Sequence, residues 1–395
     1  MIHSKARIIK YGSVFALIVC LWINLQLAQW VFVKIRKRTF AQIYEDMGFQ
    51  TAQRLNASSN KTVQDVQPVQ SIINKTVDLN ITKFQTIRNV TVKHKVKQGV
   101  NTTATRTIAK LTVCDPSSNE IGRNIFFQLK RLSKPKLNTY FQKLQPGGHW
   151  SPTKCIPAQH VAIIVPYRDR IAHLEQFLNH MHPFLQHQQT SYAIFIIEQV
   201  SPEIFNKASI MNSGFLEINK LHPRKFNCFF FHDVDLLPEN DKTPYACKTN
   251  SIAVHLANYI NIRDYELPKT HRMTGGVVGV RPDSFKKING YSNEYWGWGG
   301  EDYDLVKRLE SNKIKFENCN VDKCSYWAQK HQRDKRNPVN KNQMKMYRTF
   351  SLKRSKHEGL NSVNYTVAGV ETETRFTKIK ISITLPMSKK VKFKS

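Results

Sequence analysis

The sequence predicts an α/β fold, because nearly continuous apolar runs alternate with segments that suit helices. The runs 161–167 (VAIIVPY) and 192–199 (YAIFIIEQ) are typical of strands buried on both faces. Residues 171–189 between them suit a crossover helix. A third run, 228–238, follows another candidate helix around 205–218 and ends in acidic residues and a proline. Ligands of such sheets normally bind at the carboxyl ends of the strands, so we expect a ligand near these acids.

The composition is that of a folded protein with a strong basic bias. Of its 395 residues 41% are hydrophobic, which suits a substantial globular core. The formal charge is +31, but the 60 Lys and Arg residues are scattered along the chain and form no recognisable nucleic-acid-binding motif. We therefore expect anionic ligands or a membrane surface as partners, and no nucleic acid.

An apolar stretch near the N-terminus predicts a membrane anchor. At ~1.5 Å of rise per residue, residues 11–33 are long enough to cross a ~30 Å hydrocarbon core as one helix. A cleaved signal peptide is the alternative, although no small-residue cleavage site stands out. Basic residues flank the stretch on both sides, so the flanks leave its orientation open.

Glycosylation sequons indicate that the body of the chain is lumenal, where such sites are modified. Six sequons cluster together and a seventh follows much later; they begin at Asn56, Asn60, Asn74, Asn80, Asn89, Asn101 and Asn364. Residues 34–113 are rich in Thr, Asn, Gln and Lys, which predicts an extended stem. Residues 1–10 are then a cytosolic tail. Six cysteines lie outside the span and could pair in an oxidising compartment.

The first candidate site is the sequence HDVD at residues 232–235, directly after an expected strand. Its two carboxylates, Asp233 and Asp235, could bind a hard divalent cation and, through it, a diphosphate. A D-x-D pattern alone is weak, because solvated acids in a turn look the same.

The second candidate site is YWGWGGEDYD at residues 295–304. It combines glycines for a flexible backbone, tryptophans that could stack on sugar rings, and acids that could act as bases. The alternative is a buried tryptophan cluster followed by a helix start, with Glu301 and Asp302 as ordinary first-turn acids. So many glycines beside the acids favour a functional site.

This second motif resembles that of the β1,4-galactosyltransferase family, which reads WGWGGEDDD. The resemblance covers roughly residues 114–386 and rests on motifs in a fixed order: VPYRDR at 165–170, FNKA at 205–208, HDVD at 232–235, GGVVGV at 275–280, INGYSNEYWGWGGED at 288–302, HQRDKRNP at 331–338 and GLNS at 359–362. It implies a GT-A-type α/β domain with a mixed central sheet, in a single-pass type II protein of the Golgi membrane, with residues 387–395 as a basic tail.

The resemblance also implies an activity. Galactose or N-acetylgalactosamine would pass with inversion from a UDP-sugar in β1,4 linkage to a terminal sugar, with N-acetylglucosamine of a glycoprotein or glycolipid glycan expected. A catalytically impaired protein that still binds sugar or nucleotide is the alternative. A glycosidase fits less well, because hydrolysis gives no reason for the arginines of VPYRDR beside a D-x-D.

Site residues follow motif by motif from the resemblance. Those expected at the sugar donor are Pro166, Tyr167, Arg168, Arg170, Phe205, Lys207, Asp233, Val234, Asp235, Met273 and Trp298. Those expected at the acceptor are Gly299, Gly300, Glu301 and Asp302, with Asp302 as the base and Glu301 beside it. Mn²⁺ is the implied cofactor, bound by Asp235 and His331.

Of the six cysteines outside the span, four form two expected disulfides, and the state of the other two is left open. The family pattern implies the disulfides Cys114–Cys155 and Cys228–Cys247. It leaves Cys319 and Cys324 unexplained, either as a third disulfide or as free buried thiols.

Four positions depart from the family pattern. Ala328 replaces a metal-binding methionine, so substrate, water or Gln329, expected at the surface, would have to supply that ligand. Tyr303 replaces a motif acid that would hold the acceptor, and Lys207 replaces an arginine. Met273 stands where galactose-specific members carry a tyrosine, and the loss of that hydroxyl leaves room for the N-acetyl group of UDP-GalNAc.

Overall fold

The computed structural model describes residues 111–115, 130–268, 273–332, 334–339 and 341–385. The chain divides into two units, Met1–Thr107 and Ile108–Ser395, and all described residues belong to the second. The expected membrane span, most of the stem, the six clustered sequons and the basic tail lie outside the described residues. Within the described part, no helix has the length and apolar character needed to cross a membrane.

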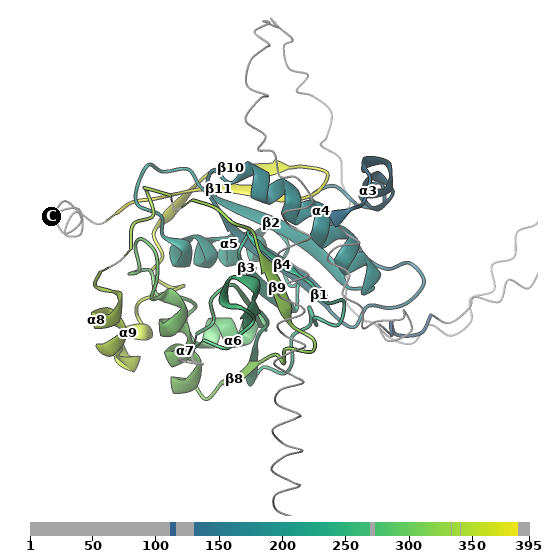
Figure 1. Ribbon diagram of the computed structural model, residues 1–395. Helices are drawn as coiled ribbons and strands as arrows, with labels where there is room; N and C mark the ends of the chain where they lie inside the picture. Colours follow the sequence, from purple (N-terminus) through teal and green to yellow (C-terminus); the bar gives the residue numbers. More distant parts are fainter. Residues whose placement is uncertain (1–110, 116–129, 269–272, 333, 340, 386–395) are drawn as a thin grey trace, which may run out of the picture. The chain divides into compact units, whose positions relative to one another are not determined.

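A mixed eight-stranded sheet forms the centre of this unit, in the order β10-β11-β2-β1-β3-β7-β5-β8 (Figure 1). The strands are β1 (His160–Tyr167), β2 (Ser191–Gln199), β3 (Cys228–His232), β5 (Ile252–His255), β7 (Val277–Val280), β8 (Lys315–Asn318), β10 (Tyr365–Thr372) and β11 (Thr377–Ile383). The neighbours β11, β2, β1 and β3 run parallel, whereas β7 is antiparallel to β3. The carboxyl ends of β1, β2 and β3 therefore meet at one edge.

Helices cover both faces of the sheet. The helices of the described segments are α3 (Lys134–Phe141), α4 (Ile171–His187), α5 (Lys207–Leu221), α6 (Pro282–Lys287), α7 (Glu301–Ser311), α8 (Gln343–Arg348) and α9 (Leu352–Ser355), with a 3₁₀ turn, η2, at Asn261–Arg263. Helices α4 and α5 are the two crossovers that the sequence predicts. The second begins at Lys207, later than expected, because the side chain of Asn206 accepts a hydrogen bond from the Ser209 N–H and caps it.

Two hydrophobic layers explain the continuous apolar run of β1. Val161 and Ile163 pack in the layer that contains Phe177 of α4, whereas the alternate residue Ile164 packs in the layer that contains Phe215 of α5. Both faces of β1 are buried after its first residue, so the strand shows no alternation of polar and apolar residues. The sheet is thus a rigid base for the loops at its carboxyl edge.

A second, three-stranded sheet lies beyond β3, in the order β4-β9-β6, formed by Leu236–Pro238, Ser325–Ala328 and Tyr259–Ile260. Leu236 pairs with Ala328 in this sheet, and the N–H of Gln329 donates to the Asp235 carbonyl at 2.8 Å. This pairing brings the segment after β9 alongside the HDVD motif. Two segments far apart in the sequence thus meet at one site.

Three disulfides link the described cysteines. Cys114–Cys155 and Cys228–Cys247 are the pairs implied by the family resemblance, and Cys319–Cys324 forms the third. The alternative of free thiols at Cys319 and Cys324 was wrong.

Candidate active site

A cleft opens at the carboxyl ends of β1, β2 and β3. The residues that line it come from five separate segments: Pro166, Arg168, Arg170, Phe205, Lys207, Asp233, Val234, Asp235, Gly297, Trp298, Gly299, Glu301, His331, Asp334 and Asn337. Parallel strands place their following loops on the same side, which explains why these segments converge. Most of the residues expected at the sugar donor are among them.

A lysine joins the acids of two motifs in this cleft. Lys207 Nζ lies 2.6 Å from Asp233 Oδ1 and 3.7 Å from Glu301 Oε1. Burial alone would lower the pKa of Lys207, but the two carboxylates outweigh burial and raise it. The pKa of Asp233 is raised by burial, against the opposing effect of Lys207. This lysine therefore stays charged and holds the HDVD strand end against the start of α7.

The two acids that begin α7 have raised pKa values. Burial, followed by the neighbouring Asp302 charge, raises the pKa of Glu301 to about 7. Burial also raises the pKa of Asp302, whose Oδ1 accepts a hydrogen bond from the N–H of Tyr303 at 3.0 Å. A carboxylate with a raised pKa is a stronger base than an exposed one, so Asp302 is suited to take a proton from a hydroxyl.

Asp302 faces a smaller pocket that adjoins the cleft through Lys207 and Glu301. A Cβ atom placed on Gly275 would stand 2.9 Å from Asp302 Oδ2 and 3.2 Å from Met273 Cε. The small Gly275 thus leaves room between a candidate base and a candidate specificity residue. Met273 lies next to this pocket, as its position in the family pattern implies.

The expected metal ligands Asp235 and His331 are adjacent. Asp235 Oδ2 lies 2.9 Å from His331 Nε2. Burial would raise the pKa of Asp235, but its hydrogen bond to His331 outweighs burial and lowers it, and the same bond raises the pKa of His331. A carboxylate beside an imidazole is a suitable set for Mn²⁺. As the side chains stand, no three His, Cys, Asp or Glu residues of the described segments converge closely enough to hold an ion.

Ala328, which stands where the family pattern has a methionine, lies in a buried segment. Ala328 is 7% exposed and packs in a hydrophobic layer, so its methyl group fills core space and offers no ligand. Gln329 was expected at the surface, but this was wrong: it is 8% exposed, and its Nε2 donates to the Val234 carbonyl at 3.4 Å. The ladder between β4 and β9 draws Gln329 inward.

The two arginines of VPYRDR have different surroundings. Arg168 stacks over Phe205 at 4.9 Å and donates to Asp334 Oδ2 at 3.2 Å and to the Arg336 carbonyl at 3.0 Å. Its guanidinium therefore fixes the segment after β9 against the cleft wall. Arg170 is less buried, lines the cleft and acts electrostatically on both Asp235 and His331. It is the better placed of the two to meet an anion.

The tryptophan segment forms another wall. The Gly297 N–H donates to the Phe205 carbonyl and the Trp298 N–H to the Pro338 carbonyl, both at 2.8 Å, and the Trp298 residue is 53% exposed. Gly299 has a φ of +101°, and a Cβ there would come within 2.0 Å of Gln343 Oε1. The positive φ favours glycine at this position, and a larger residue would also displace the end of the Gln343 side chain. Gly300 has a φ of +98° but is buried outside the cleft lining.

Tyr167 is an expected donor residue that does not line the cleft. It is 5% exposed and packs in the layer against α4, whereas its neighbours Pro166 and Arg168 line the cleft. Successive strand residues point to opposite faces, so the three cannot all line one cleft with their side chains.

Comparison with known proteins assigns the family. Residues 114–248 match the N-terminal region of glycosyl transferase group 7, and residues 255–332 match the N-terminal domain of galactosyltransferase. The chain is 42% identical over 235 residues to β-1,4-galactosyltransferase 4 of Cricetulus griseus, covering 60% of this chain and 67% of that protein. It is 40% identical over 265 residues to the Rattus norvegicus protein of the same name, covering 66% of this chain and 75% of that protein. The chain belongs to the β1,4-galactosyltransferase family.

Solved structures of the family support the GT-A-type fold. The catalytic domain of Drosophila β1,4-galactosyltransferase 7, in complex with xylobiose, is 29% identical, with a TM-score of 0.50; the match covers 59% of this chain and 97% of that one. A variant of the same enzyme in complex with manganese, UDP-Gal and xylobiose is 30% identical, with the same score and coverage. The resemblance inferred from the motifs, and the mixed α/β sheet, are thus confirmed.

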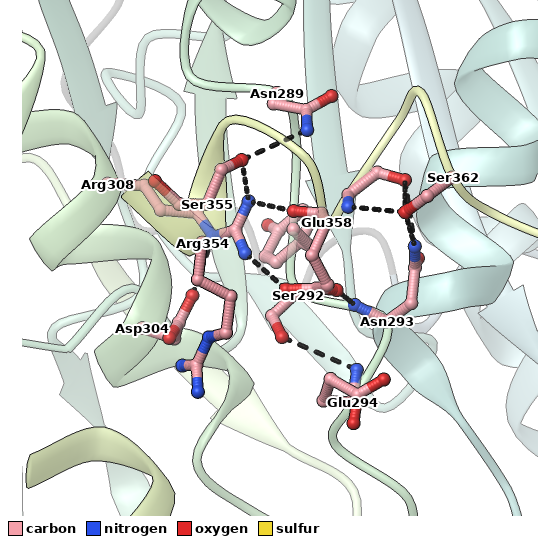
Figure 2. Close-up of polar contacts among 12 residues, drawn as sticks. Asn289, Ser292, Asn293, Glu294, Asp304, Arg308, Arg354, Ser355, Glu358 and Ser362 are labelled. Atoms are coloured by element: carbon pink, nitrogen blue, oxygen red, sulfur yellow. Dashed lines mark hydrogen bonds and ion pairs between the residues drawn. The ribbon is translucent and has the colours of Figure 1, made fainter. Parts of the chain in front are cut away.

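A buried polar network behind the family motif holds α7 in place (Figure 2). Arg308 Nε donates to Asp304 Oδ1 at 2.6 Å, and Arg308 Nη2 donates to Glu358 Oε2 at 2.7 Å. Asp304 and Arg308 are 0% and 1% exposed. Glu358 in turn accepts a hydrogen bond from the N–H of Asn293, in the same segment as the tryptophans. The network joins α7, this segment and the turn after α9.

Sequence reasoning missed Gly297, Asp334 and Asn337 in the cleft lining, and His173 beside His331. Asp334 lies within the HQRDKRNP motif, where its carboxylate could have been matched to the arginines of VPYRDR. His173 lies in the first turn of α4, and its ring meets that of His331 edge to face at 5.7 Å. Its closeness to Arg170 in the sequence was the one available signal.

Proposed function

We propose that this chain transfers galactose from UDP-galactose, with inversion, to the 4-hydroxyl of a terminal N-acetylglucosamine on a glycoprotein or glycolipid glycan. The observation that carries the proposal is the cleft in which Lys207 links Asp233 to Glu301, with Asp302 in the adjoining pocket. Such a site holds a cation-binding acid, a charged lysine and a base within one space. Its place in the β1,4-galactosyltransferase family supports the linkage.

Each group has a role in this reaction. Arg170 attracts the diphosphate electrostatically, and exposed Trp298 offers an aromatic face to a sugar. Asp302 accepts the proton of the acceptor hydroxyl as that oxygen attacks the anomeric carbon and the bond to UDP breaks. Asp235 and His331 would hold Mn²⁺, which neutralises charge on the departing diphosphate. Glu301, at the start of α7, is within reach of sugar hydroxyls.

We also propose that the chain is a single-pass type II protein of the Golgi membrane. Residues 11–33 would span the bilayer and residues 34–113 would form the stem that carries the clustered glycans. Asn364 is exposed in the structure, as a glycosylated residue must be. Labelling of this asparagine and of the stem sequons in a secreting cell tests the orientation, and a chain without glycans would contradict it.

A binding protein without turnover is the rival function, suggested by Ala328 and Tyr303. Incubation of the full chain with UDP-galactose, Mn²⁺ and an acceptor that ends in N-acetylglucosamine separates the two. A transferase releases UDP only when the acceptor is present. A protein that only binds is stabilised against heat by UDP and releases none.

A second sugar donor is favoured by the contacts of Met273. Its Cε approaches the space over Gly275 beside Asp302, where a flexible thioether can move aside for a larger 2-substituent. We therefore expect UDP-N-acetylgalactosamine to be accepted at least as well as UDP-galactose, and Met273→Tyr to favour UDP-galactose by ~10–100-fold in the ratio of kcat/KM. A strong wild-type preference for UDP-galactose that the substitution leaves unaltered would contradict this.

A further inference from the structure

We propose that His173 supplies the protein ligand that Ala328 cannot, so that the metal ion is held by Asp235, His331 and His173. This inference rests on the proposed function, since it assumes that the cleft takes Mn²⁺. It goes further by assigning to the first turn of α4 a role in metal binding.

The first step is the geometry of Asp235 and His331. Two ligand atoms bound to one ion at right angles through ~2.1 Å bonds are ~3 Å apart. Asp235 Oδ2 and His331 Nε2 are 2.9 Å apart. The two atoms can therefore bind an ion as neighbouring ligands with little movement, once the ion replaces the proton between them.

The second step is the position of His173. Its ring lies edge to face against that of His331, with centroids 5.7 Å apart and an interplanar angle of 84°. The carboxylate of Asp235 also acts electrostatically on His173. Two imidazoles that share an ion through ~2.1 Å bonds at right angles have centroids about 4.5 Å apart. The observed separation is wider than this, so the ring of His173 must move closer to that of His331 before both can bind one ion.

The third step is the tautomer of each ring. His331 Nδ1 lies 2.9 Å from the Gln332 carbonyl, and His173 Nε2 lies 3.4 Å from the Lys330 carbonyl. A carbonyl only accepts, so these nitrogens carry the hydrogens. The opposite nitrogen of each ring, Nε2 of His331 and Nδ1 of His173, is left to bind metal. Metal-binding histidines commonly use their second nitrogen in this way.

The fourth step concerns the other candidate ligands. Ala328 has no ligand atom and is packed in the core. Gln329 Oε1 is buried without a hydrogen-bond partner, but Gln329 does not line the cleft and its amide is directed at the Val234 backbone. Because no three ligand side chains converge in the described segments as they stand, His173 must turn toward Asp235 when the ion binds. His173 is only partly buried, which allows this turn.

The test measures Mn²⁺ affinity by titration, following the loss of the electron paramagnetic resonance signal of free Mn²⁺, with UDP present. His173→Phe keeps a flat ring against His331 but removes the ligand, and we expect at least a 10-fold weaker affinity. His173→Glu restores a hard oxygen ligand, and we expect affinity within about 3-fold of wild type. His187→Phe, on the last turn of the same helix, serves as the matched control and leaves affinity unchanged.

The order of the Mn²⁺ affinities of these variants distinguishes a metal ligand from a residue that only packs. If His173 only packs against His331, Phe replaces it well and Glu does not, which would overturn the proposal. Equal affinity of His173→Phe and wild type overturns it too, and weakening by Gln329→Leu in that case assigns the ligand to Gln329. A wild-type chain that binds no Mn²⁺ overturns the proposed metal-dependent function together with this assignment. Melting temperatures without metal verify that each variant is folded.

Discussion

The chemistry of the cleft depends on the protonation states of a few side chains. Lys207 is charged between Asp233 and Glu301, and this charge favours ionisation of both acids against the effect of burial. The sequence already pointed to every one of these residues, because each lies in a short motif. It did not indicate that a lysine would bridge two motifs, since that contact joins residues far apart along the chain.

Replacement of Asp302 tests the base. Asp302→Asn keeps the shape of the side chain but cannot accept the proton of the acceptor hydroxyl, so we expect transfer to fall by ~10²–10⁴-fold. UDP affinity, measured by calorimetry, should stay near that of wild type because the cleft residues that line the nucleotide side are unchanged. Turnover like that of wild type would remove Asp302 from this role.

Glu301 gives a prediction about pH. Its pKa rises to about 7 in the folded protein, so the folded state binds a proton that the unfolded state loses near its ordinary pKa of about 4.5. The resulting stabilisation is fully present below the unfolded pKa and is lost as pH rises through 7. Glu301→Gln has no such proton, so without metal or UDP the variant should gain roughly 1–3 kcal/mol in free energy of unfolding relative to wild type between pH 5 and 8. If urea unfolding shows the same difference in free energy of unfolding between the two proteins at every pH in this range, the raised pKa of Glu301 is contradicted.

At the scale of elements, α7 carries the proposed catalytic acids and is fixed by buried charges. Arg308 pairs with Asp304 and Glu358, and Tyr295 O–H also donates to Asp304, so the helix has a defined position under the cleft. The acids at its start occupy the helix N-terminus, where negative charge is favoured. The position of this helix therefore sets the position of Glu301 and Asp302.

Removal of the arginine tests this support. Arg308→Met leaves Asp304 and Glu358 without their cation in a buried site, and we expect a loss of ~3–5 kcal/mol in the free energy of unfolding. Lys315→Met serves as the matched control, because Lys315 pairs with Glu317 at an exposed site and should change stability by less than about 1 kcal/mol. Urea unfolding measures both. Equal small effects would show that the buried network contributes no more than a surface pair.

The elements that the sequence predicted are those with long apolar runs. Strands β1, β2 and β3 and helices α4 and α5 follow from such runs, because burial on both faces leaves a continuous pattern. Strand β11 alternates buried and half-buried residues in TKIKISI, and its lysines obscured a pattern of period two. Strands β5 and β7 have four residues each, too few for a pattern to stand out.

At the scale of the whole molecule, the site depends on the meeting of segments spread over more than half of the described chain. Residues near 166–170, 205–207, 233–235, 297–302 and 331–337 reach one cleft only because the sheet aligns its strand ends and β4 pairs with β9. No local pattern encodes this convergence. The family resemblance implied it, and the structure shows its contacts, including that of His173 with His331.

The central claim is that this cleft forms a β1,4 bond between galactose and a terminal sugar. The most direct measurement incubates the full chain with UDP-galactose, Mn²⁺ and an acceptor that ends in N-acetylglucosamine, and determines the product linkage by NMR. We predict galactose attached through its β anomer to O4 of the acceptor, and formation of the same product by Asp302→Asn ~10²–10⁴-fold more slowly. A product with another linkage or anomer, free galactose alone, or no reaction with a folded protein would contradict the account.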